Sequence, residues 1–220
     1  MNNAKQDINN LISKANKSLV NEDFEKASIL FSELNQLLPS NFNIKCNLAG
    51  CLGKQNKYEE SLNLYLEAKE ISKDNPDIYY NLGNAFANLK KTQESIYNYK
   101  KCLELEPTYM DAWSNLADVY LLNRDYSLCN KISEVIFSYN SSYPKAFMYK
   151  GVSLVGLHKY KESLEYLKKS LDINNDCHNS KRALATALHY LGNKNNAVKL
   201  IKETDGVFNF FSDNRPYEII

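Results

Sequence analysis

The chain has 220 residues and a net charge of +1, from 27 Lys and Arg against 26 Asp and Glu. Its 24% charged and 44% hydrophobic residues are typical of a folded protein and argue against a disordered chain. The balanced charge gives no support to general binding of nucleic acid or of an anionic membrane surface. With only 7 Gly and 5 Pro, a fold of many strands and tight turns is also disfavoured.

Residues 1–10 lack the apolar core of a signal peptide, and no apolar run approaches the roughly 20 residues that cross a bilayer. The 5 cysteines, an odd number without a Cys-x-x-Cys pair, indicate reduced thiols rather than a disulfide framework. We therefore expect a cytoplasmic protein, with the nucleus as the alternative location, and no membrane insertion.

A unit of 34 residues recurs along the chain without an insertion. In its first half, Tyr79-x-x-Leu82-Gly83-x-x-Phe86 aligns with Trp113-x-x-Leu116-Ala117-x-x-Tyr120. Its second half recurs six times, as a small residue followed four positions later by a mostly larger one: Ala27 and Phe31, Ser61 and Tyr65, Ser95 and Tyr99, Cys129 and Ser133, Ser163 and Leu167, Ala197 and Ile201.

Each unit carries two segments whose apolar residues follow helical spacing, so each unit is predicted to be a pair of amphipathic helices. In the third unit the helices are expected at about 76–89 and 92–105. A single pair cannot cover its own apolar face, and neighbouring pairs must therefore stack. In chain order the units are 8–41, 42–75, 76–109, 110–143, 144–177 and 178–211.

The turn after each first helix can also be located. An aromatic residue stands at the expected start of the second helix in four units, where packing is its simplest role. The four turns are Glu22-Asp23-Phe24, Asn56-Lys57-Tyr58, Arg124-Asp125-Tyr126 and His158-Lys159-Tyr160.

These residues resemble the tetratricopeptide repeat (TPR) family over nearly the whole chain, with unit 76–109 the best match and the terminal units the poorest. The resemblance implies an all-α fold, a right-handed α-α superhelix or TPR solenoid, whose concave face is lined mainly by first helices. We expect one TPR domain of six units over residues 1–206, followed by an aromatic tail at 207–220.

No pattern of catalytic residues stands out. The three histidines, His158, His178 and His189, lie at different repeat positions and share no metal-ligand spacing with cysteines or carboxylates. Motifs for a zinc protease, a serine nucleophile or a nucleotide-binding loop are missing from the sequence. We expect no catalytic residue, no metal and no cofactor, and hence a protein that is not an enzyme.

The concave face is the expected binding surface. The resemblance implies that six positions of each unit point inward, and one of them reads Asn47, Asn81 and Asn115 in successive units. A carboxamide offers both a donor and an acceptor, so a row of them can hold an extended peptide by its backbone. The alternative is that these residues only order the helix pairs. Tyr80, Asn84, Asp118, Lys145 and Tyr149 are predicted to line the same path.

Co-chaperone TPR domains use another device, a clamp of Lys, Arg and Asn that grips a C-terminal carboxylate. The best window here is Tyr80, Asn84, Asn115, Lys145 and Tyr149, in which tyrosines replace two of the three cations. A carboxylate would lose most of its charge-assisted hydrogen bonds there, so this clamp is disfavoured.

We therefore predict a non-catalytic adaptor or scaffold that binds a partner's extended peptide or helix in the groove. Two alternatives stay open: a structural subunit of a larger assembly, or the substrate-selecting arm of an enzyme whose catalytic domain lies elsewhere. The tail at 207–220 either caps the last unit, docks into a partner or into a second copy to form a homo-oligomer, or marks the chain as a fragment.

Overall fold

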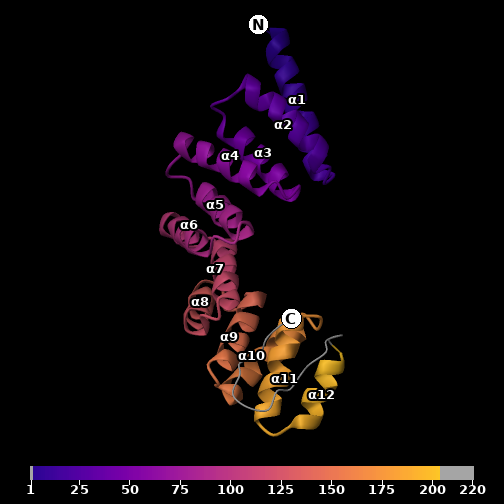
Figure 1. Ribbon diagram of the computed structural model, residues 1–220, viewed down its shortest axis with the longest axis vertical. Helices are drawn as coiled ribbons and strands as arrows, with labels where there is room; N and C mark the ends of the chain where they lie inside the picture. The colour runs from indigo at the N-terminus through magenta and orange to yellow at the C-terminus, as the bar shows by residue number, and fades with distance from the viewer. Residues whose placement is uncertain (1, 204–220) are drawn as a thin grey trace. The chain divides into compact units, whose positions relative to one another are not determined.

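The computed structural model describes residues 2–203, and these residues form twelve α-helices and no strand (Figure 1). The all-α fold of tandem TPR-like helix pairs is thereby confirmed. The bounds are α1 (Asn2–Val20), α2 (Phe24–Leu37), α3 (Phe42–Lys54), α4 (Tyr58–Ile71), α5 (Pro76–Asn88), α6 (Thr92–Leu105), α7 (Met110–Leu122), α8 (Tyr126–Tyr139), α9 (Pro144–Gly156), α10 (Tyr160–Ile173), α11 (His178–Tyr190) and α12 (Lys194–Lys202).

The helix pairs follow the sequence repeat closely. The two helices expected at 76–89 and 92–105 are α5 and α6. One difference lies at the N-terminus, where α1 begins at Asn2, ahead of the first unit's expected start at residue 8. The predicted tail at 207–220 lies outside the described residues.

The chain divides into two compact units, with the boundary between Val119 and Tyr120 inside α7. The first unit packs α1 on α2, α2 on α3, α3 on α4, α4 on α5 and α5 on α6. In the second unit, α8 packs on α9, α9 on α10, α10 on α11 and α11 on α12, and α9 also contacts α11. Packing between neighbours in sequence is the behaviour of a repeat protein. The division of a single domain into six units stays a prediction.

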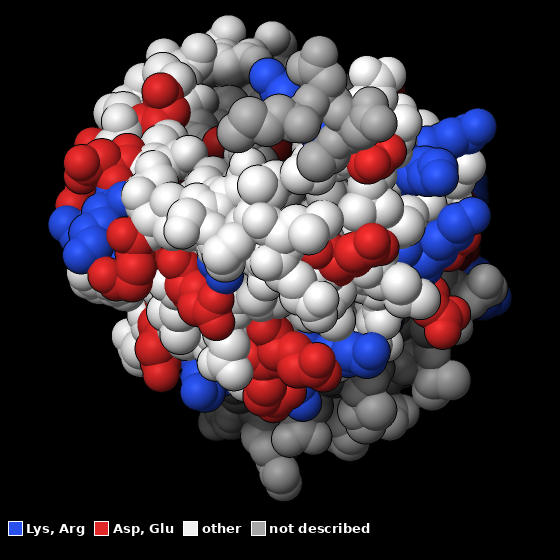
Figure 2. All heavy atoms as spheres, turned by 90° about the horizontal axis from the view of Figure 1, so that it is seen from above, with Lys and Arg blue, Asp and Glu red and all other residues white. Residues whose placement is uncertain are grey.

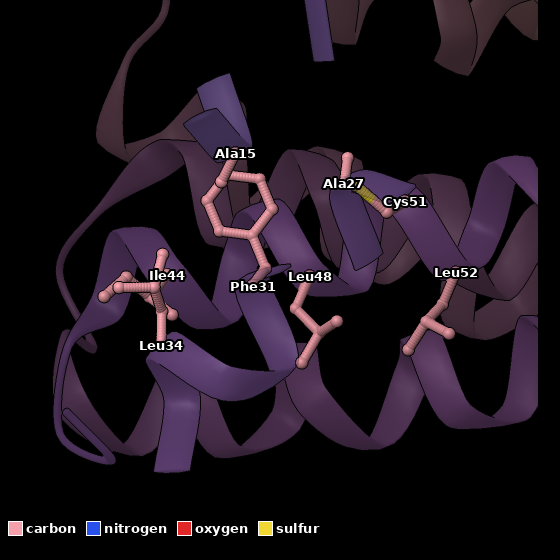
Figure 3. Packing of buried hydrophobic residues seen from close by; sticks show 8 residues of the cluster. All are labelled: Ala15, Ala27, Phe31, Leu34, Ile44, Leu48, Cys51 and Leu52. Atoms are coloured by element: carbon pink, nitrogen blue, oxygen red, sulfur yellow. The ribbon is translucent and has the colours of Figure 1, made fainter. Parts of the chain in front are cut away.

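Helix pairs are held by a small residue of the first helix facing a larger residue of the second. Gly83 on α5 lies against the ring of Tyr99 on α6, and Gly151 on α9 lies against Leu167 on α10. In the first pair Phe31 packs with Ala15 in one buried cluster (Figure 3). Both side chains are almost fully buried, which is the main source of stability in such a pair.

Buried serines add a hydrogen bond at the same contact. The Ser61 hydroxyl donates to the carbonyl of Ala49 at 2.7 Å, and the Ser95 hydroxyl donates to the carbonyl of Gly83 at 2.9 Å. Each hydroxyl is thereby satisfied away from water, so a polar residue can stand where the two helices of a pair are closest.

Every first helix ends in the same left-handed turn. Positive φ angles occur at six positions spaced by 34 residues: Glu22, Asn56, Lys90, Arg124, His158 and Gly192. At α5, the Lys90 N–H donates to the Ala87 carbonyl and the Lys91 N–H donates to the Phe86 carbonyl, both at 2.9 Å. This pair of bonds is a Schellman motif, which satisfies the last carbonyls of a helix and aims the chain at the next one.

Five of these six turns hold a residue with a side chain where glycine is favoured. Replacing Lys90, whose φ is 58°, with glycine is expected to raise the free energy of unfolding by about 0.5–1 kcal/mol, because relief of left-handed strain exceeds the added freedom of the unfolded chain. Urea denaturation measures this. The control is Lys91→Gly, at the neighbouring N-cap with φ −88°, which should bring no gain.

Candidate functional site

The structure places the eight predicted groove residues on the first helices of four successive pairs. Six belong to the first compact unit: Asn47 on α3, Tyr80, Asn81 and Asn84 on α5, and Asn115 and Asp118 on α7. Two belong to the second unit, Lys145 and Tyr149 on α9.

Two of the amides are bonded to each other. The Asn115 Nδ2 donates to Asn84 Oδ1 at 2.7 Å and lies 3.4 Å from the Tyr80 hydroxyl. Asn84 Oδ1 also accepts from the Tyr99 hydroxyl at 2.7 Å. Asn115 and Asn84 therefore join α5, α6 and α7, as expected for the ordering role that was the alternative to ligand contact.

Tyrosines surround this amide pair. Tyr80 stacks on Tyr109, with ring centroids 5.1 Å apart, and the Tyr109 hydroxyl donates to Asp77 Oδ1 at 2.9 Å. Burial raises the pKa of Tyr99 to about 12, and burial and the Asp77 carboxylate raise the pKa of Tyr109 above its usual value. Both phenols are therefore protonated at neutral pH and act as hydrogen-bond donors to Asn84 and Asp77.

Asn47 and Asn81 are arranged differently. Both are partly exposed, and their side chains hydrogen-bond to no other residue in the part of the chain that the structure describes. Their donors and acceptors are open to a ligand, so the amide row has two open members and one bonded member.

Asn47 lines a hollow of about 360 Å³ between α1 and α3. Its apolar floor includes Phe31 and Ile44, which are 1% and 4% exposed. Asn41 also lines it, but its Oδ1 caps α3 by accepting from the Ile44 N–H at 3.1 Å. The seven lining residues carry no formal charge: Ile12, Asn16, Phe31, Asn41, Asn43, Ile44 and Asn47.

Asn16 and Asn43 were not among the predicted site residues, although both stand at inward positions of the repeat. Their register could have pointed to them. What the sequence could not show is that they meet Asn47 around one apolar floor, because this depends on how closely α1 and α3 approach.

On α9, Tyr149 differs from expectation. Its side chain is buried, with 0% exposure, so it does not present a surface to a ligand. Lys145 is exposed at the start of the same helix. A tyrosine has enough apolar area to be drawn into the core between helices, which the inward register alone did not reveal.

Family models match three stretches of the chain. A TPR repeat model covers residues 52–90, and tetratricopeptide repeat models cover residues 76–109 and 98–129. The match over residues 76–109 has the same bounds as the third predicted unit. The twelve helices of the described residues fit the pattern of six pairs. The chain is a tetratricopeptide repeat protein. TPR domains generally mediate protein–protein interactions and are usually non-catalytic.

Several solved structures share this fold at low sequence identity. A TPR protein from Parabacteroides merdae superposes with a TM-score of 0.77 at 18% identity, over 90% of this chain and 78% of that one. PilF of Pseudomonas aeruginosa gives 0.76 at 14% identity, over 90% of each chain. YrrB, described as a TPR protein with an unusual peptide-binding site, gives 0.65 at 17% identity, over 79% and 90%. No curated protein sequence matches the chain.

Three of the cysteine thiols are held in their protonated form. Burial raises the pKa of Cys51 to about 11 and that of Cys102 to about 12, and burial with the Asp77 carboxylate raises the pKa of Cys46 to about 12. At neutral pH these thiols are protonated and poor nucleophiles. Over residues 2–203, His, Cys, Asp and Glu form no group of three that could hold a metal ion.

The surface charges are mixed. On the face seen from above, acidic and basic side chains alternate with wide uncharged areas (Figure 2). In the first unit, buried Lys45 on α3 pairs with Glu67 on α4, with Nζ and Oε2 2.5 Å apart. No helix within the described residues has the length and hydropathy of a membrane span.

Proposed function

We propose that this TPR protein is a non-catalytic adaptor that holds an extended, uncharged segment of a partner protein against α1, α3 and α5. The observation that carries the proposal is the hollow between α1 and α3. There the amides of Asn16, Asn43 and Asn47, which bond to no side chain among residues 2–203, surround an apolar floor. Asn81 continues the same register on the next first helix.

The chemistry of the hollow suits a peptide backbone. Each carboxamide can donate to a carbonyl and accept from an N–H, which are the two groups that an extended chain presents at every residue. The apolar floor would receive one side chain of moderate size, since pockets of about 300–1,000 Å³ are typical of specific sites. The seven lining residues supply no charge to pair with a charged side chain, so a neutral segment fits best.

Asn84 and Asn115 have a supporting role in this proposal. Their mutual bond and the bond from Tyr99 hold α5 against α7, which positions the helix that carries Asn81. Tyr149 is left out of the ligand path because it is buried. YrrB, described as a TPR protein with an unusual peptide-binding site, shares this fold and supports peptide capture by analogy.

The test compares ligand capture by the wild-type chain and by Asn47→Ala/Asn81→Ala. Peptides are selected from a displayed library of random segments and their affinities are measured by fluorescence anisotropy. Removing both amides is expected to weaken binding about tenfold or more, because each lost peptide hydrogen bond is worth about 1 kcal/mol. Circular dichroism and the melting temperature should stay unchanged, since neither side chain is bonded within the described residues.

The matched control is Asn10→Ala/Asn123→Ala, which removes two exposed amides outside the hollow. It should bind as the wild type does. Selected peptides that bind Asn47→Ala/Asn81→Ala with unchanged affinity would refute the proposed site.

A further inference from the structure

A second and larger hollow, of about 650 Å³, lies between α2 and α4 with α3 at its base. It shares no lining residue with the amide-lined hollow between α1 and α3. The base is formed by Leu48 and Leu52, which project from one side of α3 (Figure 3) and are 7% and 9% exposed.

The repeat register explains why a hollow forms here. On α2, Ser28 and Ser32 line it, while the corresponding positions one unit later hold Leu62 and Leu66. In the same way, Leu52 corresponds to Phe86 and Asn63 corresponds to Tyr97. Smaller side chains at all four positions leave open space between α2 and α4.

The walls of the hollow are acidic. Glu33 projects from α2 and Glu60 from α4, and neither carboxylate is paired with a cation among the described residues. The ten lining residues include no Lys, Arg or His. Ile29, on the same wall as Glu33, is 65% exposed and adds apolar area at the edge. A ligand that matches these walls is apolar on one side and carries positive charge at its flanks.

The geometry points to a docking site for a short basic amphipathic helix of a partner protein. Such a helix places two apolar side chains, three or four residues apart, on Leu48 and Leu52 and sets Lys or Arg beside Glu33 and Glu60. A helix suits this base better than an extended chain does. Its backbone is bonded internally, whereas a strand would leave N–H and C=O groups against leucines.

This site is independent of the proposed peptide site on α1, α3 and α5, and it extends the protein from one binding surface to two. The amide-lined hollow selects an uncharged, extended segment, while the hollow between α2 and α4 selects a positively charged, folded one. Two ligands with such different chemistry can be carried by the same compact unit.

The experiment uses the full chain and a displayed library of helical peptides about 16 residues long, which span about 24 Å. Two apolar positions are held at i and i+4, and the flanking positions are randomised. Enrichment of Lys and Arg at the flanks is expected, as is affinity that falls when salt is added. Enrichment of acidic or uncharged flanks would overturn the proposal.

Two variants locate the binding. Glu33→Gln/Glu60→Gln is expected to lower the affinity for the selected peptides about three- to tenfold. Ser32→Leu/Asn63→Tyr fills the hollow with residues like those at the corresponding positions of the next unit. It should lower the affinity for the selected peptides at least about tenfold. The control Glu25→Gln/Glu59→Gln removes the same charge from exposed positions outside the hollow and should leave affinity unchanged.

If the selected peptides bind Glu33→Gln/Glu60→Gln and Ser32→Leu/Asn63→Tyr as tightly as they bind the wild type, they bind elsewhere. This result would overturn the inference. A chain that elutes as a dimer and becomes monomeric in Ser32→Leu/Asn63→Tyr would do the same, because the occupant would then be a second copy. Asn47→Ala/Asn81→Ala should still bind the selected helical peptides. The two proposals can therefore fail independently of each other.

Discussion

Replacing Gly83 with alanine is expected to lower the free energy of unfolding by about 2–3 kcal/mol. A Cβ atom at this position would lie 2.5 Å from two ring atoms of Tyr99, well inside contact distance. The ring cannot turn away easily, because it is 2% exposed and its hydroxyl is bonded to Asn84. Added volume in a closely packed interior of this kind typically costs about 1–3 kcal/mol. Urea denaturation followed by circular dichroism measures the loss.

Two further variants separate crowding from other effects. Gly50→Ala also replaces a helical glycine, but its Cβ would meet only the Tyr65 hydroxyl at 3.5 Å, so better helix propensity should stabilise the chain by about 0.5–1 kcal/mol. Gly83→Ala/Tyr99→Ile reproduces the Ala185 and Ile201 pair of the last repeat and should recover part of the loss. A Gly83→Ala chain as stable as the wild type would contradict the packing described here.

The free energy of unfolding is expected to fall steeply at alkaline pH. Burial raises the pKa of Cys51 to about 11 and that of Cys102 to about 12, from 9.0 in the unfolded chain. Between pH 9 and 11 the unfolded chain therefore binds fewer protons than the folded one, and the stability that is present below pH 9 is lost as the pH rises. Two thiols together give a slope of about 3 kcal/mol per pH unit. Urea midpoints between pH 7 and 11 record this loss.

The matched control is Cys51→Ala/Cys102→Ala. Alanine stands at the corresponding positions of other repeats, Ala85 and Ala68, and is buried there, so the variant is expected to fold. Its stability should fall less steeply between pH 9 and 11, with Cys46 still contributing to the decline. An equally steep decline in the variant would assign the effect to other groups whose pKa is raised by burial, Cys46 and Tyr65, and not to Cys51 and Cys102.

The helices could be predicted because one register is repeated six times. Apolar spacing located α5 and α6 to within a residue, and the turn segments marked the start of the second helix in four pairs. Contacts between side chains of different helices were less accessible. The inward register placed Asn115 in the predicted amide row, but it could not show that Asn115 would bond to Asn84, since this depends on the approach of α5 to α7.

Side-chain size carried information that the register of polar residues did not. The hollow between α2 and α4 follows from Ser28 and Ser32 standing where later repeats have larger residues. Tyr149 shows the opposite case, in which a residue at an inward position is large and apolar enough to be buried. A comparison of side-chain volumes at equivalent repeat positions would have indicated the hollow. The burial of Tyr149 depends on the packing of the helices around it, which the sequence did not show.

Packing between sequence neighbours allows the protein to unfold locally, one helix pair at a time. Within each compact unit, most of a helix's partners are the helices directly before and after it, so melting one pair leaves distant pairs with their own contacts intact. Amide hydrogens should therefore exchange with solvent in graded blocks, fastest at the ends of the array and slowest at its interior pairs. A chain of this kind can yield a terminal pair to proteolysis or to a binding partner while the remainder stays folded.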